Sequence, residues 1–293
     1  MATGKGAATR ENVKGVVYVF LSAVCFALAG VLIKSIDWNA LSVSGGRSIF
    51  AAAVLYVYLR IQGKRLVLNR AVAIGAAVNF IMLQTFVIAN KMTTAANAIV
   101  LQFTMPAWII IILWVFFGEK PRRSALVACI TIFVGVVCFF FDQLSSEGLI
   151  GNIVAVVSGI AYAGVFLIKR FPECDFESAA ILSFVACAIC GLPSLVQETD
   201  FAPTTIAAVV VLGVVQVGFA YIFLSKGLDS VSPVAAALIS TIEPILNPLL
   251  VAAFVGETVG PLSLVGAVLV IVAAAAYNVH VARYPALETR SGA

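Results

Sequence analysis

The sequence predicts an all-α membrane protein in which ten transmembrane helices form two inverted five-helix repeats. Three observations predict it: the composition, the alternation of long apolar stretches with short polar ones, and the similarity of the two halves. Of the 293 residues, 62% are hydrophobic and 11% are charged, whereas soluble domains carry about 25% charged residues. Most of the surface must therefore face lipid.

Ten apolar stretches reach or approach the roughly 20 residues that a helix needs to cross a hydrocarbon core of about 30 Å. They lie near residues 13–33, 41–60, 71–90, 94–117, 124–141, 149–168, 178–197, 204–225, 231–254 and 261–282. Short polar breaks join them, so consecutive helices should be antiparallel. Residues 1–12 and 283–293 are expected to be loose cytoplasmic tails, without a signal peptide.

The basic residues gather on one side of this arrangement. The opposite side carries only Lys34 and Lys91, and Arg47 lies inside the second span. The basic side holds Lys5, Arg10, Lys14, Arg60, Lys64, Arg65, Arg70, Lys120, Arg122, Arg123, Lys169, Arg170, Lys226, Arg283 and Arg290. Because loops rich in Lys and Arg stay in the cytoplasm, we expect a multi-pass protein of the cytoplasmic (inner) membrane with both termini in the cytoplasm.

The stretches 13–141 and 149–282 resemble each other. Pro106 precedes Glu119 by 13 residues, and Pro244 precedes Glu257 by the same interval. Since each half has five spans, the second half must enter the membrane in the opposite direction. Inverted repeats are typical of secondary transporters, whose halves exchange inward-open and outward-open roles around a central site. An old duplication in a structural or signalling membrane protein is the alternative.

Specific segments carry a family resemblance. They are Arg47, TTAANAIVLQFTMPAW with the following GEK and Gly135, and SPVAAALISTIEPILNP with the following GET and Gly266. In these the chain resembles the EamA-type members of the drug/metabolite transporter superfamily over nearly its whole length. The resemblance implies a basket-like bundle whose central cavity is lined mainly by spans 1, 3, 4, 6, 8 and 9. It also implies a substrate among amino acids, nucleotide or sugar derivatives and organic cations. The chain departs from a perfect repeat at Met105, where the second half has Glu243.

Two ionisable residues lie deep in predicted spans, where a charge is costly and so marks a functional candidate. Glu243 precedes Pro244, which removes a backbone hydrogen bond and should kink the ninth span. Glu243 is expected to take up a proton or pair with a cationic substrate; alternatively, it bonds a neighbouring helix and stays neutral. Arg47 is expected to snorkel towards the headgroups as an anchor, or else to bind a carboxylate.

Polar and aromatic residues inside the spans are the remaining candidates for substrate contact. They are Asn79, Asn97, Gln102, Trp108, Tyr162, Gln216, Tyr221, Ser240 and Asn247. Such residues equally hold membrane helices together. Trp108 could stack on a substrate ring or cation, whereas Trp114 fits the interfacial aromatic belt. Glu119 and Glu257 are assigned to helix ends, and the Cys187–Cys190 pair to packing.

The sequence contains no nucleotide-binding, serine-hydrolase or zinc-protease motif. We therefore expect no enzyme, no catalytic residues, no metal and no cofactor. The expected function is secondary active transport, as importer or exporter, of a small polar metabolite such as an amino acid or organic cation by alternating access. The expected partners are that substrate, the lipid bilayer and protons as a candidate coupling ion, with no nucleic acid. Monomer and homodimer both remain open, and the alternative functions are a membrane channel or a non-transporting scaffold.

Overall fold

The computed structural model describes residues 2–93, 95–141, 148–246 and 260–283. Within these residues every regular element is helical. The first half contains α1 (Ala2–Ala27), α2 (Ala29–Lys34), α3 (Ala40–Ile61), α4 (Arg70–Met92), α5 (Ala95–Gln102), α6 (Met105–Phe117) and α7 (Arg123–Phe140). The second half contains α8 (Leu149–Leu167), η2 (Ile168–Arg170), α9 (Phe176–Leu195), α10 (Pro203–Val211), η3 (Leu212–Phe219), α11 (Ala220–Leu228), α12 (Pro233–Ser240) and α14 (Pro261–Arg283).

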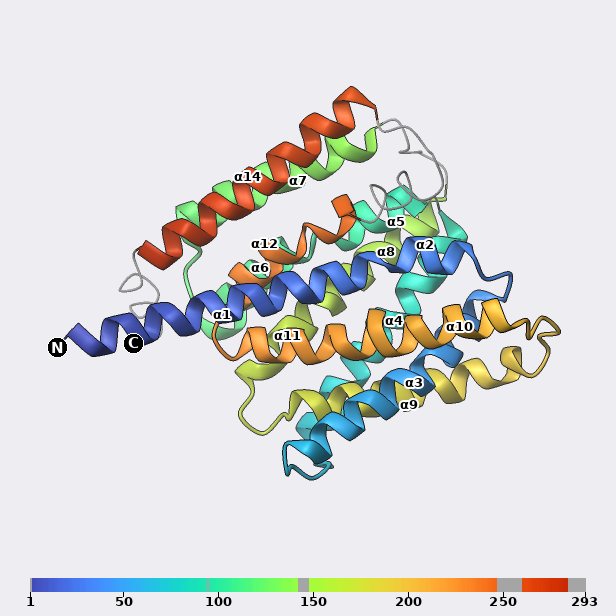
Figure 1. The fold of residues 1–293 in the computed structure, drawn as a ribbon. Helices are drawn as coiled ribbons and strands as arrows, with labels where there is room; N and C mark the ends of the chain where they lie inside the picture. Colours follow the sequence, from blue (N-terminus) through green and yellow to red (C-terminus); the bar gives the residue numbers. More distant parts are fainter. Residues whose placement is uncertain (1, 94, 142–147, 247–259, 284–293) are drawn as a thin grey trace.

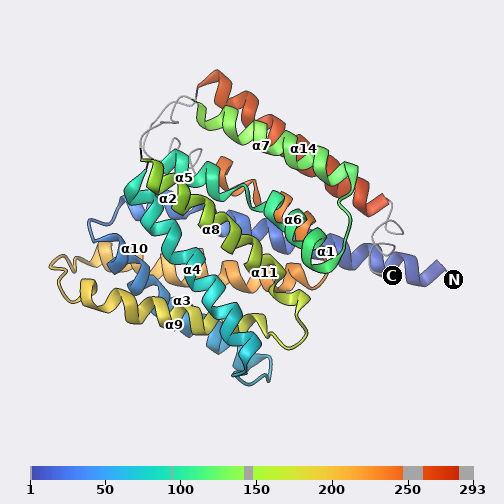
Figure 2. The same ribbon diagram turned by 180° about the vertical axis from the view of Figure 1, so that it is seen from behind.

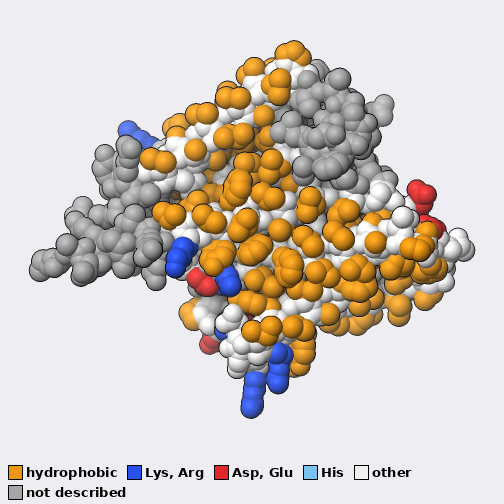
Figure 3. Space-filling view, in the orientation of Figure 1, with side chains coloured by type: hydrophobic (Ala, Val, Ile, Leu, Met, Phe, Trp, Pro, Cys, Tyr) orange, Lys and Arg blue, Asp and Glu red, His pale blue; other side chains and the backbone are white. Residues whose placement is uncertain are grey.

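The helices match the predicted spans. Among the described residues, seven helices are long and apolar enough to cross a membrane. Three shorter apolar helices, at Val13–Ala27, Arg123–Cys138 and Pro233–Leu246, lie where the other spans are predicted. Hydrophobic side chains cover the visible face of the bundle, while Lys and Arg gather towards one end (Figure 3). The predicted fold class, an all-α membrane protein with two repeats, is confirmed.

One boundary prediction is wrong. Residues 2–12 were expected to be a loose tail, but α1 begins at Ala2 and continues into the first span. The physical reason is that extending an existing helix avoids the cost of nucleating one, and alanine, which recurs in this segment, has the highest helix propensity. The tail predicted beyond α14, at residues 284–293, lies outside the described residues.

The helices pack in a two-fold pattern. The first span of each half lies along the third span of the other half, so that α1 packs against α11 and α8 against α4. The second spans pair with each other as α3 and α9, and the fifth spans pair as α7 and α14 (Figures 1 and 2). Because each contact has a counterpart in the other half, the halves are related by the approximate two-fold symmetry expected of inverted repeats.

Small residues allow the two second spans to approach closely. A Cβ atom added at Gly191 of α9 would lie 2.6 Å from the Cα atom of Gly45 on α3. On the fifth spans, a Cβ atom at Gly135 would lie 3.0 Å from the carbonyl oxygen of Gly266. Helices in lipid associate through such close backbone contacts rather than through the hydrophobic effect.

The fourth and ninth spans are interrupted at equivalent positions. The fourth span breaks at Phe103 and Thr104, between α5 and α6, and the ninth breaks at Thr241 and Ile242, after α12. Each break lies just before the proline of its repeat, and proline cannot donate the backbone hydrogen bond that a continuous helix requires. Phe103 and Thr241 are buried, so protein rather than lipid surrounds the interrupted backbone.

Because α3 and α9 are in close contact, we expect Gly191→Leu to destabilise the protein strongly. The leucine side chain would have to displace α3, because the space at Gly191 is already filled by backbone atoms. We expect the free energy of unfolding in detergent to fall by about 1–3 kcal/mol or more. Ala77→Leu, at an exposed position of α4, is the control and should unfold like the unmodified protein. Equal stability of the two variants would contradict the close approach.

Candidate functional site

Glu243 lies in the first turn after the break in the ninth span. Its Oε2 atom is buried and has no hydrogen-bond partner among the described residues. The helix before it, α12, packs against α8 and α11, which carry Tyr162 and Tyr221. A buried polar group normally has a partner, so this unpaired oxygen distinguishes Glu243 from the polar groups around it.

A fully paired network lies beside this carboxyl group. The Tyr221 hydroxyl donates to Oδ1 of Asn79 on α4 at 2.7 Å, and Nδ2 of Asn79 donates to the Ser183 hydroxyl on α9 at 2.5 Å. The Ser183 hydroxyl in turn donates to the carbonyl oxygen of Ala180. Three helices are therefore joined by one chain of hydrogen bonds in the interior.

Aromatic rings enclose the two tyrosines. The Tyr221 ring contacts the rings of Phe184, Phe26 and Phe176, at centroid distances of 4.9, 5.7 and 6.0 Å. Tyr162 contacts the rings of Phe166 and Phe103 edge to face, at 5.2 and 6.3 Å. Since these rings come from both halves of the chain, the tyrosines lie between the repeats.

Arg47 is buried, with 8% of its surface exposed, and one of its guanidinium nitrogens donates to Oε1 of Gln216 at 3.2 Å. The snorkelling expected for Arg47 is therefore not observed. Gln216 lies in η3, a π-helical segment in the middle of the eighth span, and such segments are frequent at functional sites. Gln216 and Tyr221 lie on the same span, so Arg47 is joined to the span that carries Tyr221.

Gln102 and Ser240 end the helices that precede the two breaks, and both are buried. The Gln102 amide donates to the Ser158 hydroxyl on α8 at 2.8 Å, and Ser158 donates to the carbonyl oxygen of Met82 on α4. Gln102 thus connects the end of α5 directly to α8 and, through Ser158, to α4.

Two further candidates hydrogen-bond close to the fourth span. Asn97 hydrogen-bonds to Asn152 and Thr93, both at 3.1 Å, and so ties the start of α5 to α8. The Trp108 indole donates to the Thr104 hydroxyl at 3.2 Å beside the break, and its ring is half-buried. Asn247 lies outside the described residues.

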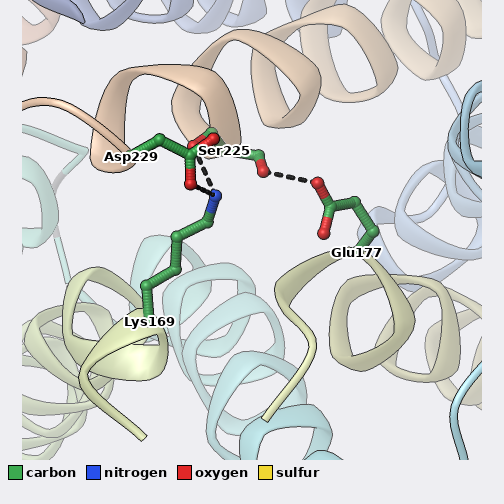
Figure 4. Close-up of polar contacts among 4 residues, drawn as sticks. All are labelled: Lys169, Glu177, Ser225 and Asp229. Atoms are coloured by element: carbon green, nitrogen blue, oxygen red, sulfur yellow. Dashed lines mark hydrogen bonds and ion pairs between the residues drawn. The ribbon is translucent and has the colours of Figure 1, made fainter. Parts of the chain in front are cut away.

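At the basic end of the bundle, charged side chains form contacts between neighbouring helices. The basic residues there are Lys64, Arg65, Lys120, Lys169, Arg170 and Lys226. Lys169 pairs with Asp229 at 2.6 Å and donates to the Ser225 carbonyl oxygen at the same distance (Figure 4). The Ser225 hydroxyl donates to the buried carboxylate of Glu177 at 2.6 Å. These contacts join the ends of the sixth and eighth spans to the start of the seventh.

A second ion pair at the basic end links Arg170 to Glu119. Glu119 follows Gly118, whose positive φ of 69° ends α6, and its backbone N–H bonds to the Leu113 carbonyl oxygen. Glu119 therefore joins the end of the fourth span to the end of the sixth. Its counterpart Glu257 lies outside the described residues.

At the opposite end, side chains join the second span to the loop before α10. The Trp38 indole donates to the Asp200 carbonyl oxygen at 2.6 Å, and the Asn39 backbone N–H donates to the Glu198 carboxylate at 2.8 Å. Hydrogen bonds from the Thr205 hydroxyl and the Ala202 backbone N–H lower the pKa of Asp200. Both ends of the bundle thus carry defined polar contacts.

The EamA-like transporter family model matches residues 13–141 and again residues 149–279. This chain belongs to that family. An uncharacterized transporter of Archaeoglobus fulgidus is 26% identical to this EamA-like protein over 266 residues, which are 86% of this chain and 92% of the relative. The uncharacterized transporter YwfM of Bacillus subtilis is 26% identical over 159 residues, 52% of this chain and 54% of the relative.

A crystal structure of a protein that is 17% identical shares the fold, with a TM-score of 0.79 over 92% of this chain and 97% of that chain. The EamA-like protein is therefore a multi-pass membrane protein, and its family and relatives support a transporter of a small molecule rather than an enzyme. Among the described residues no group of three His, Cys, Asp or Glu side chains could hold a metal ion.

Sequence reasoning missed several polar residues of this EamA-like interior. Ser158 and Ser183 are fully buried hydrogen-bonding residues, but a serine in an apolar span is also common where helices only pack. Glu177 lies just outside the predicted span 178–197, whereas the structure places it in the first turn of α9, where it is 5% exposed. Acidic residues are favourable in the first turn of a helix, and this signal could have found it.

The paired network predicts that Tyr221→Phe destabilises the EamA-like protein. The variant removes the hydroxyl that donates to Asn79 and leaves a buried amide oxygen without its donor. We expect the free energy of unfolding in mixed micelles to fall by about 1–3 kcal/mol. Tyr56→Phe is the matched control because Tyr56 is 46% exposed. A Tyr221→Phe variant as stable as this control would show that the hydrogen bond contributes nothing.

Proposed function

We propose that this protein is a secondary active transporter of a small polar metabolite, an amino acid or an organic cation, that works by alternating access. The observation that carries the proposal is the buried carboxyl oxygen of Glu243 at the break in the ninth span, which has no hydrogen-bond partner among the described residues. Removing a carboxylate from water costs several kcal/mol unless a partner compensates. A cationic group of the substrate, or a bound proton, would supply that partner.

The interrupted helices support a site at this level of the bundle. Where a membrane helix is broken, backbone groups and half-helix ends become available to a ligand, and transporters place substrate and coupling-ion sites there. The fourth and ninth spans break at equivalent positions of the two repeats. The site would thus lie on the approximate two-fold axis, where movement of one half relative to the other exposes it to either side.

The position of Arg47 favours a zwitterionic substrate over a simple cation. Arg47 is buried and hydrogen-bonds to Gln216 on the eighth span, which also carries Tyr221, and Glu243 has a buried carboxyl oxygen on the neighbouring ninth span. An amino acid could direct its carboxylate to the guanidinium and its ammonium group to Glu243, because charge-assisted hydrogen bonds of this kind are about twice as strong as neutral ones. Residues between these charges, including Gln216 and Ser240, would then contact the substrate.

Alternating access requires that the ends of the bundle open in turn. The contacts of Lys169 with Asp229 and of Arg170 with Glu119 would have to separate when the basic end opens. The contact of Trp38 with Asp200 would separate at the other end. We further propose that the basic end faces the cytoplasm, following the positive-inside rule, and that both termini lie there, in the cytoplasmic membrane.

The alternatives to a transporter are a membrane channel and a non-transporting scaffold. A counterflow assay in proteoliposomes distinguishes these three functions. Proteoliposomes preloaded with unlabelled substrate should transiently accumulate labelled substrate if the protein is a transporter. A channel would give uptake without accumulation, and a scaffold would give neither. Amino acids and quaternary amines are the first substrates to compare, since they differ in the carboxylate that Arg47 would bind.

The role of Glu243 predicts the behaviour of Glu243→Gln. The amide keeps the size of the side chain but can neither take up a proton nor neutralise a cation. We expect the transport rate in proteoliposomes to fall about tenfold or more, as loss of a charged hydrogen bond of 1.5–3 kcal/mol implies, or its pH dependence to disappear. Glu173→Gln, in an exposed loop, is the control. Unchanged kinetics and pH profile would remove Glu243 from the mechanism.

The half-buried indole of Trp108 predicts a contribution to affinity. If the ring stacks on a cationic or planar part of the substrate, Trp108→Ala should raise the apparent KM about fivefold, as a cation–π contact of about 1 kcal/mol implies. Trp114→Ala is the matched control because Trp114 is 54% exposed and is expected to face lipid. The same KM in both variants would assign Trp108 to packing.

A further inference from the structure

The two fifth spans form a groove that the transport mechanism does not use. It lies between α7 and α14, which run side by side at the edge of the bundle (Figures 1 and 2), and it has a volume of about 840 Å³. None of the polar interior residues described above lines it. Its walls are mostly exposed aliphatic side chains such as Val127, Val268 and Val272.

One end of the groove is polar and cationic. Arg123 and Ser124 line it from the start of α7, and Tyr277 and His280 from the end of α14. Tyr277 and His280 also take part in contacts of their own, and the guanidinium of Arg123 supplies a permanent positive charge at this end. Arg122, the residue before α7, forms no side-chain cap. Because α7 begins at this end of the groove, the first backbone N–H groups of this 18-residue helix point towards it. An anionic group is favoured at such a helix start.

The length of the groove fits one leaflet of a bilayer. Its apolar lining on α14 extends from Leu264 to Ala276, which at about 1.5 Å per residue is roughly 18 Å. Half of a hydrocarbon core of about 30 Å is roughly 15 Å. The apolar part would therefore hold an acyl chain while the polar end reaches the headgroups.

We propose that this groove binds an anionic phospholipid, with the phosphate at Arg123 and the start of α7 and an acyl chain along Val127 and Val268. The charge at one end and the apolar walls along the rest match the two parts of such a lipid. Basic pockets between transmembrane helices recognise anionic headgroups in this way. A neutral lipid would gain the apolar contacts but not the attraction of Arg123.

The test is native mass spectrometry of the purified full-length protein, titrated with phosphatidylglycerol or with phosphatidylcholine of the same acyl chains. We expect tighter binding of phosphatidylglycerol, and Arg123→Gln should weaken it about fivefold, as loss of one basic contact near the headgroups implies. Phosphatidylcholine binding should not change. Arg65→Gln, an exposed basic residue outside the groove, is the control and should bind both lipids like the unmodified protein.

A second variant tests the groove itself. Val268→Trp fills the apolar part and should reduce binding of phosphatidylglycerol while Arg123 is still present. Equal affinity for the two lipids, or no effect of Arg123→Gln relative to Arg65→Gln, would overturn the proposal. A dimer whose interface excludes lipid from α7 and α14 would also overturn it, because a second copy of the chain would then occupy the groove. Transport plays no part in these measurements, so the failure of one proposal leaves the other standing.

Discussion

The absence of water from the hydrocarbon core constrains every other feature of this protein. Backbone N–H and C=O groups there must bond within the protein, so an interrupted helix can exist only where protein surrounds the break. The fourth and ninth spans are both interrupted, and buried residues such as Phe103 and Thr241 lie at the breaks. The remaining spans must therefore cover the two breaks, and the interior around the breaks is where polar side chains can be satisfied.

Most of the polar side chains in this interior are paired, and the pairs join helices. Tyr221, Asn79 and Ser183 link three spans, and Gln102 and Ser158 link two more. Satisfied networks of this kind fix the relative positions of helices. Among the described residues, the buried side-chain oxygens without a partner are those of Ser22, Ser42 and Glu243, and Glu243 is the one carboxyl group among them. A group that costs stability without a partner is best explained by a ligand that binds there, which is why the proposed site centres on it.

The two halves of the bundle differ in their charged residues and in their backbone conformation. Met105 occupies the position equivalent to Glu243, and the π-helical segment η3 in the eighth span has no counterpart in the continuous helix α4 of the third. Equivalent helices thus provide a symmetric framework, while the two halves contribute different chemistry to its centre: Arg47 from the first and Glu243 from the second. This asymmetry would allow one site to bind a substrate with two different charged groups.

The sequence by itself determined the fold class and the family, because hydropathy and the repeated proline and Gly-Glu spacing are local signals. It also made Glu243 a candidate, since a carboxyl group inside a long apolar stretch is conspicuous. Only the tertiary structure decided which polar residues meet. Arg47 hydrogen-bonds to Gln216 in the interior, and Asn97 hydrogen-bonds to Asn152 on α8. Ser158, Ser183 and Glu177 are buried hydrogen-bonding partners. These outcomes depend on the rotation and crossing of helices far apart in the chain, and the hydropathy of a single span carries no information about either.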